Sequence, residues 1–110
     1  MMNHNLPASD VAGVLAAINP TSQSAGTQST SWISAANYTN FLAIIQAGVL
    51  GASATLDAKI EQATDSSGTG AKDVTGKAIT QLTKAGSDDS KQALIAFRQA
   101  DLDIANDYTR

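Results

Sequence analysis

The chain has 110 residues, a formal net charge of −3 and no cysteine. This length suits one domain with a single modest core, and the lack of cysteine excludes disulfides, thiolate chemistry and cysteine-ligated zinc. Phosphate backbones are bound by clustered Lys and Arg, which this sequence does not contain, so nucleic acid is not expected as a partner. No run approaches the ~18 apolar residues of a membrane helix, so no membrane partner is expected.

Residues 1–30 are predicted to form a polar N-terminal arm with one apolar segment, SDVAGVLAAINP at 9–20. The apolar side chains of this segment fall at helical spacing, and Asn19-Pro20 would end a helix. Gly13 opposes a helix, so a short helix and an extended arm both stay open. In either form the candidate partner-binding anchors are the same four apolar residues of the arm: Val11, Val14, Leu15 and Ile18.

Residues 31–110 are predicted to form a β domain. STSWISA at 29–35 supplies a β-rich start, and TNFLAIIQAGVLG at 39–51 contains a nearly continuous apolar run at 41–45, typical of a strand buried on both faces. TLDAKIEQA at 55–63 alternates strictly, which indicates a half-buried strand with Leu56, Ala58 and Ile60 inward.

Two further strands are expected after this alternating one. They are AITQLT at 78–83 and QALIAFRQ at 92–99, the second with Ala93, Ile95 and Phe97 on one face. Short strands separated by turn signals favour an all-β antiparallel sandwich or barrel. Although 43% of the residues are hydrophobic, alanine supplies much of that share. The core should therefore be thin, and a two-layer β-sandwich suits it better than a large barrel.

The Gly/Ser-rich stretch TDSSGTGAKD at 64–73 invites comparison with a phosphate-binding loop. That motif needs Gly-x-x-x-x-Gly-Lys-Ser/Thr. Gly76-Lys77 are present, but Ala71 occupies the first position and Ala78 replaces the hydroxyl residue. The stretch is interpreted as a connection between two strands.

Acidic residues cluster twice near the C-terminal end, at Asp88-Asp89 and at Asp101, Asp103 and Asp107. Either cluster has the oxygen ligands that a cation uses, but neither has the central Gly and terminal Glu of an EF-hand, so solvated turns are expected. The question of a cation among Asp101, Asp103 and Asp107 stays open. His4, the only histidine, lies in the polar arm. No acid sits in an apolar run that would raise its pKa, so neither an enzyme nor a cofactor is predicted.

Taken in order, several short motifs make the chain resemble a group of small structural proteins of tailed bacteriophages and prophages, typically encoded next to the major capsid protein. The resemblance covers roughly residues 18 to 110. The motifs are Asn19-Pro20, Ala25-Gly26-Thr27, Trp32, Ala47-Gly48, Leu56 to Asp65, Asp73 to Thr83, and Phe97-Arg98.

The resemblance implies a jelly-roll-like β-sandwich that forms part of the virion. The first expectation is a capsid decoration, cement or head-spike subunit on the phage head, which binds the major capsid protein or neighbouring virion subunits and forms a homo-oligomer. A head–tail connector or tail component is the alternative. A carbohydrate-binding module is weaker, because it needs more exposed aromatic residues than five aromatics supply.

One departure from the group concerns the C-terminal end. Its members usually continue past a Tyr-x-Arg into another apolar strand, whereas this sequence ends at Arg110. Two expectations stay open: the sequence is a fragment or a processed form, or a neighbouring subunit fills the position of the further strand, since an unpaired sheet edge accepts another strand.

Overall fold

The computed structural model describes residues 5, 7 and 12–110, and antiparallel strands with almost no helix make up its regular structure. This confirms the all-β prediction. Among the described residues the strands form three two-stranded ribbons: β1 (Asn40–Gln46) with β6 (Gln92–Arg98), β2 (Thr55–Leu56) with β5 (Leu82–Thr83), and β3 (Lys59–Gln62) with β4 (Lys72–Ala78). Two single-turn 3-10 helices follow β6: η1 (Gln99–Asp101) and η2 (Ile104–Asn106).

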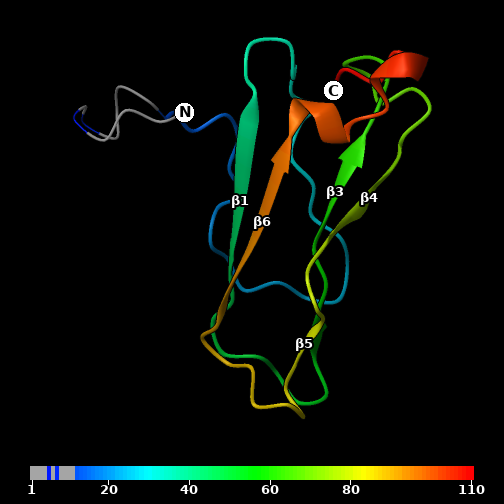
Figure 1. The fold of residues 1–110 in the computed structure, drawn as a ribbon. Coiled ribbons are helices and arrows are strands. Elements are labelled where there is room, and N and C mark those ends of the chain that lie inside the picture. The colour runs from blue at the N-terminus through cyan, green and yellow to red at the C-terminus, as the bar shows by residue number, and fades with distance from the viewer. Residues whose placement is uncertain (1–4, 6, 8–11) are drawn as a thin grey trace.

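The two longer ribbons lie next to each other, and β1 lies on the side of the N-terminal segment (Figure 1). The β3–β4 ribbon lies on the β6 side of the β1–β6 ribbon, where β4 contacts β6. The short β2–β5 ribbon lies at the end of the molecule remote from the C-terminus (Figure 1). As a result, β1 has a strand neighbour on one edge only among the described residues.

The β1–β6 ribbon is regular, with seven residue pairs in unbroken register from Asn40–Arg98 to Gln46–Gln92. Ala93, Ile95 and Phe97 lie on its inner face, as predicted, and Ile95 is buried. The prediction that residues 41–45 are buried on both faces is wrong. Burial alternates along β1, and Leu42 and Ile44 are 59% and 56% exposed because no layer of the described structure covers their face.

The alternation predicted for residues 55–63 is confirmed, with Leu56, Ala58 and Ile60 less exposed than their neighbours. The stretch is divided between two strands, β2 and β3, which pair with different partners. The β3–β4 register also shifts between Lys59 and Glu61, so this ribbon is irregular where β1–β6 is not.

Two predicted strand boundaries are wrong. Lys72 and Asp73, predicted to lie in the loop, begin β4, and of the predicted strand 78–83 only Ala78 and the two residues of β5 are in strands. The reason is local: β4 carries Gly76 at a φ of +74° and charged residues at its start, features typical of a loop.

Residues 29–35, which give Trp32 and Ile33 a β-rich context, form no strand in the structure. Ala35 N–H donates to the Thr109 carbonyl at 2.9 Å, and the Gln99 side chain donates to the Ala35 carbonyl at 2.9 Å. Trp32 packs against Gly68, where an added Cβ would collide with the indole. The segment is held by these separate contacts, without the ladder that defines a strand.

Residues 12–34 contain neither helix nor strand, so the described part of the arm is irregular and the short helix is not found in it. Val11 lies outside the described residues. The division into an arm at 1–30 and a domain from 31 stays a prediction.

The core is thin, as its composition predicts. Ala35, Val74 and Leu102 form its centre, with Phe41 and Ile60 packed against them, and no large side chain of the described residues is fully buried. Leu102 belongs to the segment between η1 and η2, so the C-terminal residues help to close the core.

Candidate functional site

The predicted anchors of the arm project into solvent wherever the structure describes them. Val14 is 88% exposed, Leu15 39% and Ile18 48%. Within the described residues, no backbone–backbone hydrogen bond involves positions 12–34. Val14 therefore adds little to the stability of the chain itself, because it buries little surface in it, whereas Leu15 and Ile18 are about half covered.

A second exposed apolar group lies on the β1–β6 ribbon. Leu42 and Ile44 of β1 and Leu94 of β6, which is 57% exposed, point to the same side, and Ile44 stands directly opposite Leu94 in the register. We call these three residues the outer face. Exposed apolar residues that occur singly are normal, whereas a contiguous group marks an interaction surface.

The arm and the outer face adjoin. Ile18 and Pro20 of the arm border a shallow hollow whose other side is formed by Ile44 and Gln46. The two exposed apolar groups thus form one region on the β1 side of the molecule. The sequence predicts the arm anchors but not the outer face, because Leu42 and Ile44 alternate with inward residues that are equally apolar.

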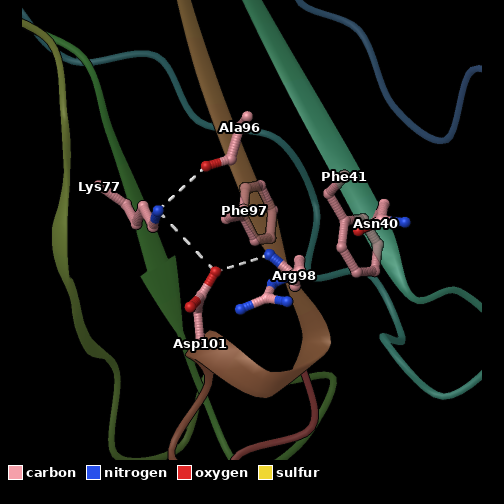
Figure 2. Close-up of a pocket in the computed structure, with 7 residues that line it drawn as sticks. All are labelled: Asn40, Phe41, Lys77, Ala96, Phe97, Arg98 and Asp101. Carbon is pink, nitrogen blue, oxygen red and sulfur yellow. Dashed lines mark hydrogen bonds and ion pairs between the residues drawn. The ribbon is translucent and has the colours of Figure 1, made fainter.

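A separate pocket lies where the two longer ribbons meet (Figure 2). Lys77 of β4 reaches across it, donates to the Ala96 carbonyl of β6 at 3.1 Å and pairs with Asp101 at 3.8 Å. Asp101 also accepts a hydrogen bond from the Arg98 backbone N–H at 2.7 Å. Phe41 and Phe97 stack beside them with ring centroids 4.9 Å apart. Since Lys77 and Asp101 already pair with each other, the pocket serves to join the ribbons.

The Gly/Ser-rich stretch connects β3 to β4, which confirms its interpretation as a hairpin connection. Asp65 accepts hydrogen bonds from the backbone N–H groups of Ser67 at 2.9 Å and Thr69 at 3.1 Å. The pKa of Asp65 is lowered below its ordinary value, mainly by a hydrogen bond from the Thr69 side chain and next by one from the Thr69 backbone. The Asp65 carboxylate thus occupies loop amides that a phosphate-binding loop would present to its ligand.

Asp88 and Asp89 hold the turn before β6 in place. The Asp88 carboxylate accepts from Lys91 at 2.8 Å and from the Thr83 N–H at 2.9 Å. The Asp89 carboxylate accepts from Lys84 at 2.6 Å and from the Leu50 N–H at 2.7 Å. The pKa of both carboxyl groups is lowered, mainly by the hydrogen bond from the lysine and next by the one from the backbone N–H.

The second acidic cluster is likewise engaged with other protein groups. Asp103 accepts from Lys72 at 2.6 Å and from the Asn106 side chain, and the Lys72 contact is the main reason that its pKa is lowered. Asp107 caps η2 in a left-handed conformation with a φ of 65°. Within the described residues, no group of three or more His, Cys, Asp and Glu side chains is arranged to hold a metal ion. His4 lies outside those residues.

No family model, curated protein or solved structure matches this chain. The resemblance to phage structural proteins therefore stays a prediction from the sequence. In the part of the chain that the structure describes, no helix has the length and apolar character needed to cross a membrane.

Proposed function

We propose that the chain is a structural subunit of a bacteriophage virion that acts by binding and not by catalysis. Its role is that of a capsid decoration, cement or head-spike protein, and its partner is the major capsid protein or a neighbouring virion subunit. The proposal rests on the ordered motifs from Asn19-Pro20 to Phe97-Arg98 and on the character of the exposed apolar region.

The observation that carries the proposal is the arm. A chain that leaves Val14 88% exposed on an irregular segment without backbone–backbone hydrogen bonds has both side chains and backbone groups ready for a partner. Burying a side chain of this size contributes about 1.5–3 kcal/mol. An extended arm that orders along a shell would bury Val14, Leu15 and Ile18 in this way.

The proposal includes the finer architecture. We infer a jelly-roll-like β-sandwich over residues 31–110, in which the three ribbons are layers of one domain and neighbouring subunits supply further cover. The contact between β4 and β6 supports this arrangement, as does the shared core of Ala35, Val74 and Leu102.

Immunogold electron microscopy tests the location. Particles purified from a host that carries the gene are labelled with an antibody against the chain. The proposal predicts label over the heads. Label confined to the neck or tail would replace it with the connector or tail alternative, and particles without label would contradict a virion role.

A substitution experiment tests the arm. Val14, Leu15 and Ile18 are all changed to Asp in the full chain, and co-sedimentation with particles that lack the protein is measured. We expect binding to weaken by at least about 100-fold, with no change in Tm. The matched control changes Ser22, Ser24 and Ser29 to Asp, three exposed polar positions of the same arm with the same added charge. Equal losses in both variants would contradict apolar anchoring.

A further inference from the structure

The free edge of β1 is the starting point. Ala47 N–H donates to the Lys91 carbonyl and Gln99 N–H donates to the Thr39 carbonyl, one pair beyond each end of the β1–β6 register. Bonded and non-bonded pairs alternate in an antiparallel ladder, so the odd-numbered residues of β1 bond to β6. The even-numbered residues direct their N–H and C=O groups outward, and within the described residues no hydrogen bond joins them to another segment.

This edge lacks the features that normally keep strands apart. Sheet edges are protected by charged residues, proline, bulges or a covering segment. β1 reads NFLAIIQ, without charge, proline or glycine, and its register with β6 has no bulge. An uncharged seven-residue strand of high β-propensity is also the kind of segment that pairs between chains.

The arm of the same chain does not fill the edge. Ile18 and Pro20 lie near Ile44 and Gln46, but residues 12–34 donate and accept no backbone–backbone hydrogen bond within the described structure. Pro20 has no N–H to donate. The arm therefore lies beside β1 without pairing with it.

The residue pattern of β1 indicates what pairs with it. Read from either end about Ala43, the strand runs amide, apolar, apolar, Ala, apolar, apolar, amide. Two antiparallel copies centred on Ala43 would place Asn40 opposite Gln46, Phe41 opposite Ile45 and Leu42 opposite Ile44. In that register even-numbered residues meet even-numbered residues, so every outward N–H and C=O group finds a partner. Shifting one copy by a single residue would set outward groups against groups already bonded to β6.

We propose that a second copy of this chain binds the free edge of β1, as an antiparallel β1–β1 pair about a two-fold axis at Ala43. The two ribbons join into one four-stranded sheet, and Leu42 of each copy contacts Ile44 of the other on the outer face. Such isologous pairing is the commonest way to close a homodimer. The inference does not depend on the virion role, since it concerns a different contact and a different partner.

A disulfide tests the register. Ala43 of both copies forms a non-bonded pair with Cα atoms about 4.5 Å apart, within the range that a disulfide bridges. The chain has no cysteine of its own, so Ala43→Cys should give a covalent dimer under oxidation. Ala47→Cys is the matched control, because its two copies would lie roughly 27 Å apart. Failure of Ala43→Cys to cross-link, or equal cross-linking by both variants, would overturn the proposal.

Sedimentation velocity over a concentration series to about 1 mM separates edge pairing from stacking of outer faces. Ile44→Lys places a charge on the edge strand, whereas Leu94→Lys places it at an equally exposed site one strand inward. We expect the wild type and Leu94→Lys to dimerise and Ile44→Lys to remain monomeric. Equal disruption by both variants, or a wild type that stays monomeric throughout, would overturn the proposal. The same series with Val14, Leu15 and Ile18 changed to Asp should still show the dimer. Loss of the dimer in this variant would mean that the arm of the second copy, and not its β1, makes the contact.

Discussion

The two longer ribbons are both antiparallel pairs, yet they expose different kinds of residues to solvent. On β3–β4, Lys59 pairs with Asp73 at 2.7 Å and with Glu61 at 3.2 Å, and the register contains a bulge. On β1–β6, the register is unbroken and Leu42, Ile44 and Leu94 face outward. Charged residues and a bulge are the means by which a sheet faces water and rejects other strands.

This difference assigns separate roles to two parts of one small domain. The β3–β4 ribbon turns its charged residues to solvent and Val74 and Ile60 to the core. Its contacts with Asp103 and, through the hairpin loop, with Tyr108 hold the C-terminal segment in place. The β1–β6 ribbon and the arm expose apolar surface that the chain does not use for itself. Because the core is thin, each aliphatic side chain that stays exposed is one fewer to stabilise the folded chain by burial.

The largest predicted effect distinguishes the two faces of β6. Ile95→Ala removes a buried side chain and should lower the free energy of unfolding by about 2–5 kcal/mol. Leu94→Ala, at the next position and 57% exposed, should change it by less than about 1 kcal/mol. Urea unfolding followed by circular dichroism measures both, and equal losses would show that the outer face contributes to folding as much as the inner one.

A smaller effect is predicted at the hairpin loop. Gly68 has a φ of +84°, and a Cβ there would collide with the Trp32 indole. Gly68→Ala should therefore cost about 1–3 kcal/mol and lower Tm measurably. Gly48→Ala, beyond the end of β1, has nothing within 4 Å of the added Cβ and serves as the control. A Tm drop as large for Gly48→Ala as for Gly68→Ala would contradict this packing.

The smallest effect is a pH dependence confined to the charged regions. The pKa of Asp103 is lowered mainly by Lys72, and that of Asp88 mainly by Lys91. A lowered folded-state pKa contributes stability that is complete above the unfolded-state value of about 3.9 and is lost as the pH falls through the lower folded value. NMR spectra recorded from pH 6 downward should therefore show changes around Asp103 and Asp88 below about pH 4 before β1 changes. Simultaneous change throughout the chain would contradict local contributions.

Local pattern predicts a good part of this fold. Ala93, Ile95 and Phe97 alternate with more exposed residues, and their inward face follows from that alternation alone. The hairpin connection at 64–71 follows from its Gly, Ser and Asp content. Both features depend on a few neighbouring residues, so the sequence contains what is needed to predict them.

The errors arise where distant contacts decide the structure. Trp32 and Ile33 favour a strand, but a strand also needs a neighbour to pair with, and here Trp32 packs on Gly68 instead. Leu42 and Ile44 are as apolar as residues of a buried strand, and only the lack of a covering layer leaves them exposed. The predicted start of β4 is too late because Lys and Asp are common in loops, although the pairing of Lys72 with Gln62 and of Asp73 with Glu61 places both in the ribbon.

The most direct test of the account is hydrogen–deuterium exchange by mass spectrometry on the full chain, free and bound to phage particles. The described N–H groups of the arm lack backbone partners in the free chain and should exchange rapidly. On binding, we predict slower exchange at residues 12–20, with residues 59–78 unchanged. Slower exchange confined to residues 59–78, or no change anywhere, would contradict the claim that the chain binds through its arm.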